Sequence, residues 1–321
     1  MQQVALRQHQ FRNALQSLLL VLAMALLFGY LAWSLGGVPL AVAAVGAVAV
    51  AYLANPAVSP QWVLRLYRGR SLGQSEAPEL YALVAELARR AKLPAVPRLY
   101  YLPSDVMNAF ATGHGDDSAI GVSDGLLRRL SLRELGGVLA HEITHIRNRD
   151  LRVMGFADLI GRFTWLLSSA GMVLLFVNLP MVLVTGSGLG WGPILALLVA
   201  PTVAGLIQLA LSRSREYEAD LGAAELTGDP AGLASALARM DRIQGRVLEQ
   251  ILLPGQRIPE PSLLRTHPPI TERINRLTSL LEAPGWQASH PREEWRATPA
   301  PERLVAPHPF RARWHHSGLW Y

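Results

Sequence analysis

The stretch Phe163–Ser212 reads FTWLLSSAGMVLLFVNLPMVLVTGSGLGWGPILALLVAPTVAGLIQLALS and contains no Asp, Glu, Lys or Arg. A membrane-spanning helix needs about 20 apolar residues, so this stretch is long enough for two. We expect spans at Phe163–Val184 and Trp191–Leu211, joined by the glycine-rich turn Thr185–Gly190. The stretch therefore predicts a membrane hairpin.

A second charge-free stretch, Asn13–Leu64, lies near the start of the chain. It predicts spans at Ala14–Trp33 and Gly36–Ala54, with the turn Ser34–Pro39 between them. A cleaved signal peptide is not expected, because the first apolar stretch is too long and leads directly into a second. Together the two stretches predict a mainly α membrane protein with four transmembrane helices in two hairpins.

The composition supports this class. Half of the 321 residues are hydrophobic and only 17% are charged, whereas soluble domains carry roughly a quarter. The chain has no cysteine, which excludes disulfide scaffolds, zinc fingers, iron–sulfur clusters and cysteine nucleophiles. Any metal must therefore be held by histidines and carboxylates.

Arginine carries the net charge of +6, since Lys92 is the only lysine. Arginines flank the outer ends of both hairpins, and neither hairpin turn is charged. The positive-inside rule then predicts a multi-pass protein of a bacterial-type inner membrane, with both termini and the segment Gln61–Arg162 in the cytoplasm. We expect Arg213 and Arg215 to anchor lipid rather than serve the reaction. No basic–aromatic recognition segment is present, so the expected partner is the lipid bilayer and not nucleic acid.

The polar segments predict a small α+β part. Helical spacing of apolar residues predicts helices, alternation with turn signals predicts strands, and a small antiparallel sheet is the simplest packing. The expected helices are Pro78–Lys92, Ala231–Ile243 and Thr266–Glu282, and the expected strands are Arg98–Leu102, Met107–Thr112 and Ala119–Val122.

Another helix is predicted from a capping box at Ser131–Glu134, and it should run to about Asn148. It carries His141-Glu142-Ile143-Thr144-His145. Positions i and i+4 lie about 40° apart around a helix axis, so both imidazoles can reach one Zn²⁺. Glu142, rotated by about 100°, can accept a proton from the attacking water and deliver it to the leaving amine. The competing interpretation is a pair of surface histidines.

A glycine lies one turn before the first histidine of this motif. We expect Gly137 to leave space for a substrate or for a third metal ligand.

A catalytic zinc site needs three protein ligands. Glu216 and Asp220 share a helix face just beyond the last span, so Glu216 can be the third ligand while Asp220 accepts the second ring N–H of a ligand histidine. A solvated charge cluster at the end of a membrane helix is an equally open interpretation of these two residues.

The pattern resembles the HtpX-type membrane zinc metalloproteases, which are relatives of the CAAX prenyl proteases. The resemblance rests on the order of four elements between two membrane hairpins: Met107–Gly113, His141–His145 with Asn148 and Asp150, Ser212–Asp220, and Thr266–Pro269. It implies a zincin-like domain of the gluzincin type with one Zn²⁺ per chain, in which His141, His145 and Glu216 are ligands and Glu142 is the general base.

The resemblance also implies a substrate site and a further catalytic residue. Asn108, Ala109 and Phe110 would lie on an edge strand that binds an extended peptide, although they can equally be turn and core residues. His267 would stabilise the oxyanion, although it can equally be a structural residue before Pro268 and Pro269.

The expected function is hydrolysis of internal peptide bonds in membrane or misfolded polypeptides at the cytoplasmic face, in protein quality control. A CAAX-type prenyl-protein protease and a non-enzymatic membrane scaffold with a structural metal are the alternatives. The sequence gives no oligomeric state.

The expected organisation alternates membrane and cytoplasmic parts. The segments are hairpin 1–60, protease part 61–162, hairpin 163–211, protease part 212–282 and a tail at 283–321. The tail is rich in Pro, Trp and His and should contact the membrane interface, or else fold over the active site.

Overall fold

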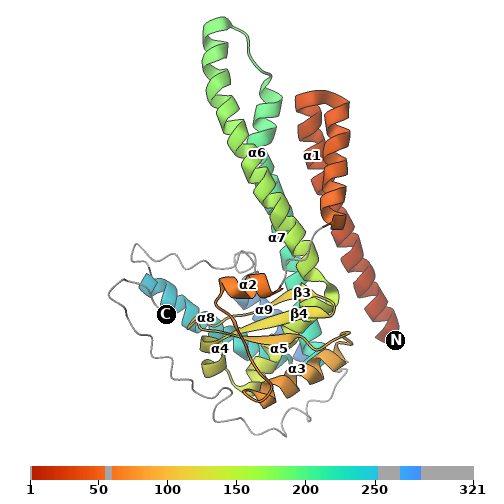
Figure 1. Cartoon of the computed structure of the whole chain (residues 1–321), viewed down its shortest axis with the longest axis vertical. Helices are drawn as coiled ribbons and strands as arrows, with labels where there is room; N and C mark the ends of the chain where they lie inside the picture. The colour runs from red at the N-terminus through yellow and green to blue at the C-terminus, as the bar shows by residue number, and fades with distance from the viewer. Residues whose placement is uncertain (1, 55–59, 252–267, 283–321) are drawn as a thin grey trace.

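The computed structural model describes residues 2–54, 60–251 and 268–282, so His267 and the predicted tail lie outside the described residues. Long helices rise from a smaller part that contains a four-stranded sheet (Figure 1). The elements are α1 (Gln2–Ala54), α2 (Pro60–Leu66), β1 (Arg70–Ser71), α3 (Pro78–Arg90), β2 (Arg98–Leu102), β3 (Ala109–His114), β4 (Asp117–Ser123), α4 (Asp124–Arg129), α5 (Leu132–Asn148), α6 (Asp150–Thr185), α7 (Trp191–Thr227), α8 (Pro230–Ile251) and α9 (Ile270–Glu282).

The second predicted hairpin is present as α6 and α7, which are long and apolar enough to cross a membrane. Asn178 closes the turn between them: its amide donates to the carbonyl of Leu189 and accepts from the N–H of Leu189. Both helices extend beyond the predicted spans into the sheet-containing part, so the two candidate spans also reach the candidate site.

The first predicted hairpin forms α1, which folds back on itself at Gly36 and Gly37 (Figure 1). The φ of +70° at Gly37 explains why a glycine stands there. Its two arms carry apolar segments, Leu22–Ser34 and Gly36–Tyr52, that are shorter than α6 and α7. The arms pack on α6 and α7 through a cluster that includes Met24 and Phe156.

The sheet is mixed, so the predicted purely antiparallel sheet was wrong. β3 and β4 form the expected antiparallel hairpin, but β4 lies between β2 and β3 and runs parallel to β2. The chain passes β2, forms β3 at the far edge, and returns through the hairpin into the central position. Strand patterns give the strands but not their order in space, which is why the sequence did not reveal this arrangement.

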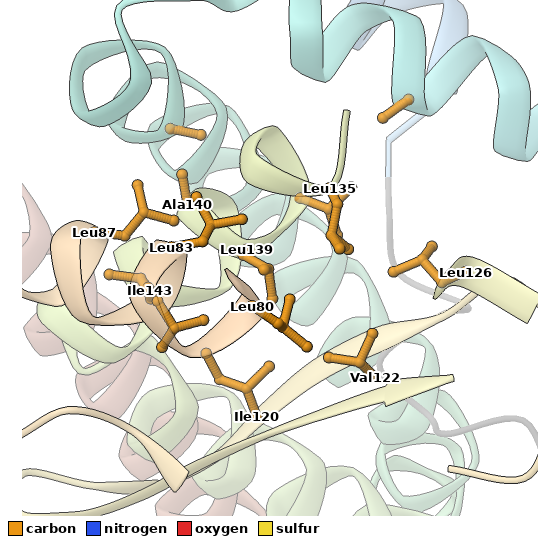
Figure 2. Packing of buried hydrophobic residues seen from close by; sticks show 14 of the residues in the cluster. Leu80, Leu83, Leu87, Ile120, Val122, Leu126, Leu135, Leu139, Ala140 and Ile143 are labelled. Atoms are coloured by element: carbon orange, nitrogen blue, oxygen red, sulfur yellow. The ribbon is translucent and has the colours of Figure 1, made fainter. Parts of the chain in front are cut away.

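The hydrophobic core lies between the sheet, α3 and α5 (Figure 2). The apolar face of each helix is buried. Leu80, Leu83 and Leu87 on α3 face Leu139 and Ile143 on α5. The capping box is confirmed: Ser131 accepts from the N–H of Glu134, and the N–H of Ser131 donates to the Glu134 carboxylate. These contacts fix the start and the rotation of the helix that carries both histidines.

One short connection and one close helix contact bring the candidate site residues together. Arg149 alone, in the left-handed conformation with φ +59°, separates α5 from α6. Gly222 lets α7 approach α5 closely, because a Cβ there would collide with Thr144 and lie 2.8 Å from the Arg147 guanidinium. This approach brings the Glu216 turn of α7 opposite the two histidines of α5.

Candidate active site

His141, His145 and Glu216 converge on one point, as the sequence predicts. One ligand atom from each of the three lies within 4.8 Å of the others. The two Nε2 atoms are 3.2 Å apart, and the Glu216 carboxylate oxygens lie 3.5 Å from His141 Nε2 and 3.6 Å from His145 Nε2. All three side chains are buried. The open interpretations, surface histidines and a solvated charge cluster, do not describe these residues.

The spacing fits zinc. Two atoms that each lie about 2.0–2.1 Å from one tetrahedral ion are about 3.3–3.4 Å apart. The measured separations of 3.2, 3.5 and 3.6 Å bracket this value. Two imidazoles and a carboxylate are also the donor set of a catalytic zinc site, which keeps its fourth position open.

A chain of polar contacts runs from His145 into both membrane helices. His145 Nδ1–H donates to Asp150 at 2.9 Å, and Asp150 accepts from Arg215 Nη1 at 2.6 Å. A carboxylate can only accept hydrogen bonds, so the proton of His145 stays on Nδ1. The lone pair of His145 Nε2 is then available to bind a metal. Asp150 begins α6 and Arg215 lies on α7, so both arms of the hairpin orient this histidine.

A matching chain holds His141. The Nδ1 of His141 lies 3.0 Å from Asp220, and Arg273 donates two hydrogen bonds of 2.6 and 2.8 Å to Asp220. Arg273 Nη1 also lies 3.1 Å from the Glu216 carboxylate. One guanidinium thus fixes both the expected third ligand and the carboxylate that orients the first histidine.

The charges around the centre balance a divalent cation. Four carboxylates and two guanidinium groups leave a net charge of minus two when both imidazoles are neutral. These groups are Glu142, Glu216, Asp150, Asp220, Arg215 and Arg273. A divalent ion neutralises the cluster, and so do two protons on the histidines.

The pKa shifts follow this balance. Burial acts to lower the pKa of both histidines, but hydrogen bonds to carboxylates outweigh it. The pKa of His141 is raised by Asp220 and Glu216. The pKa of His145 is raised well above 6.5 by Asp150 and Glu216. Burial acts to raise the pKa of Asp220, but the hydrogen bonds from Arg273 hold it below its ordinary value. The metal-free histidines therefore bind protons readily, and Asp220 stays ionised.

Glu142 lies between the metal cluster and the sheet. Its carboxylate accepts from the backbone N–H of Ala111 on β3 at 2.8 Å. β3 pairs with β4 only, so it is an edge strand among the described residues. Backbone groups alternate along an antiparallel strand, so the N–H and C=O of Ala109, Ala111 and Gly113 point away from β4. The predicted general base thus contacts the unpaired edge of the sheet, at a residue that is only 3% exposed.

The three predicted substrate residues have different positions. Asn108 precedes β3, and its N–H and C=O bond with Ser123. Ala109 packs against the core on the α5 side, whereas Phe110 points to the other face and packs on Tyr67, with ring centroids 5.1 Å apart. The Phe110 side chain is therefore a core residue.

Two further expectations were wrong. A Cβ at Gly137 would lie 2.8–2.9 Å from the backbone of Leu233, so this glycine admits α8 rather than a substrate or a ligand. Arg215 is only 1% exposed and pairs with Asp150, so it does not anchor lipid. Arg213, in contrast, is exposed, and its contact with lipid stays a prediction.

Sequence reasoning did not assign Arg215 and Arg273 to the site and gave Asp150 no role. The available signals were weak but present. Asp150 lies five residues after His145, and Arg215 directly precedes Glu216. Arg273 interrupts the apolar face that Ile270, Ile274 and Leu277 form on the last helix. None of these signals specifies a partner.

A family profile described as peptidase family M48 matches residues 74–281, well over half of the chain. This chain belongs to peptidase family M48. The matched range contains the metal cluster, the strands β2, β3 and β4, and both arms of the α6–α7 hairpin. The M48 chain is therefore a zinc metallopeptidase, with His141, His145 and Glu216 as its possible metal site.

Curated relatives match this chain over most of their length. A "Protease HtpX homolog" of Methylibium petroleiphilum is 36% identical over 293 residues, covering 84% of this chain and 98% of the relative. One of Acaryochloris marina is 41% identical over 276 residues, covering 82% and 92%. The M48 chain is thus a membrane-bound protease of the HtpX type, as its motifs indicated. A solved structure, "Crystal Structure of S. mikatae Ste24p", matches at 20% identity and TM-score 0.43 over 71% of this chain and 55% of that one.

Proposed function

We propose that this protein cleaves internal peptide bonds of membrane or misfolded polypeptides at the cytoplasmic face of a bacterial-type inner membrane, as part of protein quality control. The observation that carries the proposal is the buried convergence of His141, His145 and Glu216 beside an open sheet edge. The edge offers backbone groups to a polypeptide, and the cluster offers a zinc site next to them.

The roles of the residues follow from their positions. His141, His145 and Glu216 hold the metal, and Asp220 and Asp150 orient the two imidazoles. Zinc in this site supplies the Lewis acid that polarises the scissile carbonyl and activates water. Glu142 accepts the proton of the attacking water and gives it to the leaving amine, because its carboxylate stands beside the cluster.

The substrate binds as an added strand along β3. The outward C=O groups of Ala109, Ala111 and Gly113 and the outward N–H groups of Ala109 and Gly113 can pair with an extended peptide, while the N–H of Ala111 is held by Glu142. Such pairing reads backbone rather than side chains, which suits substrates of varied sequence. Glu142, already bonded to Ala111, then stands next to the bound chain.

The proposed arrangement has four spans, because the apolar segments Leu22–Ser34 and Gly36–Tyr52 of α1 lie beside α6 and α7 and contain no charged residue. Residues 1–60 and 163–211 form the hairpins, and residues 61–162 and 212–282 together build the protease. Glu216 lies five residues beyond Leu211, roughly 7–8 Å along the helix. The metal therefore lies close to the cytoplasmic surface of the bilayer, where loops and tails of membrane proteins are within reach.

The test uses the full chain in detergent or vesicles, with zinc content measured beside digestion of casein and of a membrane-anchored reporter. We expect about one zinc per chain and cleavage within both substrates, lost with a chelator and restored by zinc. Bound zinc without cleavage of either substrate would favour the scaffold alternative. Cleavage of a prenylated peptide alone would favour the prenyl-protein protease.

A further inference from the structure

Helix α2 has one face on the sheet and one face in solvent. Leu64 is 1% exposed and packs with Leu102, Phe110 and Ala119. On the other face, Trp62 and Leu66 lie one turn apart and are 66% and 72% exposed. A pair of large apolar side chains at this spacing forms a small apolar surface that nothing in the described part of the chain covers.

The distribution of exposed apolar side chains indicates what covers this surface. Among the residues that the structure describes, the large exposed hydrophobic side chains lie on α1, α6, α7 or the turn between α6 and α7. The exceptions are Trp62, Leu66, Val96 and Leu281. Val96 and Leu281 stand singly, which is common on protein surfaces. Only the α2 pair continues the apolar surface that faces lipid.

The position of α2 agrees with a bilayer. It lies on the side of the sheet that faces the long helices, whereas α3 lies on the opposite side (Figure 1). Only residues 55–59 separate it from the end of α1, so α2 begins within about 20 Å of a membrane helix. Arg65 and Arg68 are exposed beside the apolar pair. Tryptophan prefers the membrane interface, and arginine complements anionic headgroups.

We propose that α2 anchors the protease part to the membrane surface. Trp62 and Leu66 enter the headgroup layer, while Leu64 packs against the sheet. Since Phe110 of β3 packs in the same cluster as Leu64, the anchor keeps the substrate edge beside the bilayer. The expected substrate is then an extended segment that emerges from the membrane. This inference rests on the proposed location of residues 61–162 at the cytoplasmic leaflet.

The chain has no cysteine, so a single label can be placed without other changes. An environment-sensitive fluorophore is attached to Trp62→Cys in the full protein, in vesicles of phosphatidylethanolamine and phosphatidylglycerol. The control is Ala82→Cys, which lies exposed on α3. We expect a blue-shifted emission at position 62 that lipids with a headgroup-level nitroxide quench, and neither effect at position 82. Equal access of aqueous iodide to both labels would overturn the anchor.

The second measurement tests what the anchor does. The double variant Trp62→Glu, Leu66→Glu should cleave casein like the wild type, but should cleave a membrane-anchored reporter roughly tenfold more slowly, because β3 is no longer held beside the bilayer and meets a lower effective concentration of the anchored segment. Ala82→Glu is the matched control and should leave both rates unchanged. An equal loss on both substrates would overturn the anchor, since it would indicate a distorted site.

Failure of the proposed function gives a different result. A wild-type protein that cleaves neither substrate would overturn that function, and so would an Ala82→Cys label accessible only from the outer face. In both cases the depth of the label at position 62 still decides whether α2 enters the membrane surface.

Discussion

Arg215 and Asp150 form an ion pair of 2.6 Å that is closed to solvent and joins the two helices of a membrane hairpin directly behind a metal-site histidine. Removing one partner of a buried pair leaves an uncompensated charge, at a cost of about 3–5 kcal/mol. We therefore expect Asp150→Asn to lower the free energy of unfolding by about that amount. The same variant should weaken zinc binding about 10–100-fold, because a neutral amide replaces the carboxylate that accepts from His145 and holds its tautomer less firmly. Denaturant unfolding and zinc titration measure the two effects.

A double variant separates orientation from stability. Asp150→Asn combined with Arg215→Met removes both charges, so most of the lost stability should return. Zinc binding should stay weak, because the contact with His145 is still altered. If the double variant recovered both properties, Asp150 would have a structural role only.

Glu142→Gln tests the general base. Its amide occupies the same volume but cannot accept the proton, so cleavage should fall by about 10²–10⁴-fold while zinc content stays near that of the wild type. Peptide hydrolysis and metal analysis on one preparation give both numbers. Glu282→Gln, on the exposed end of α9, is the control and should leave hydrolysis unchanged. Undiminished turnover in Glu142→Gln would refute the role.

Zinc binding should weaken as the pH falls. The raised pKa values of His141 and His145 mean that protons compete for the same nitrogens, so the apparent affinity should begin to fall above pH 6.5. Up to two protons should be released per ion. Calorimetry in buffers of different ionisation enthalpy counts them, and a zinc affinity that is constant from about pH 8 to pH 6 would contradict the expectation.

The metal-free protein should depend on pH in the opposite sense. A histidine whose pKa is raised by folding contributes stability that is fully present below its unfolded value near 6.5. That contribution is lost as the pH rises through the folded value. Thermal unfolding after chelation should therefore show a falling midpoint with rising pH across this range.

Gly222→Ala tests the approach of α7 to α5. The added Cβ collides with Thr144, which is completely buried, so the helices must separate. We expect a loss of about 1–3 kcal/mol and weaker zinc binding, because Glu216 moves with α7. Gly155→Ala is the matched control: its Cβ meets nothing within 4 Å, and alanine should stabilise the helix by about 0.5–1 kcal/mol. Similar results for both variants would contradict the packing argument.

Local patterns predicted much of this fold. The strand Arg98–Leu102, the capping box at Ser131 and the end of α5 at Asn148 agree with the structure, because each depends on neighbouring residues. The position of β4 beside β2 and the packing of α8 on Gly137 depend on contacts between distant segments. Those contacts leave no periodic signal in the sequence.

The same division holds for the site. The spacing of His141 and His145 predicted a shared metal, since one helix sets their geometry. Arg273 could not be placed, because its partners Asp220 and Glu216 lie on another helix about fifty residues away. A buried arginine on an otherwise apolar face signals that a partner exists, but not which one.

The open edge of β3 has a consequence for selectivity. An edge that bonds to backbone accepts whichever chain can release a few extended residues from its own fold. The free energy of that local fraying is a property of the substrate, and each 1.4 kcal/mol changes the population of frayed chains about tenfold. Such a protease would rank its targets by how loosely they are held together, and a well-packed neighbour would escape cleavage without carrying any protective signal.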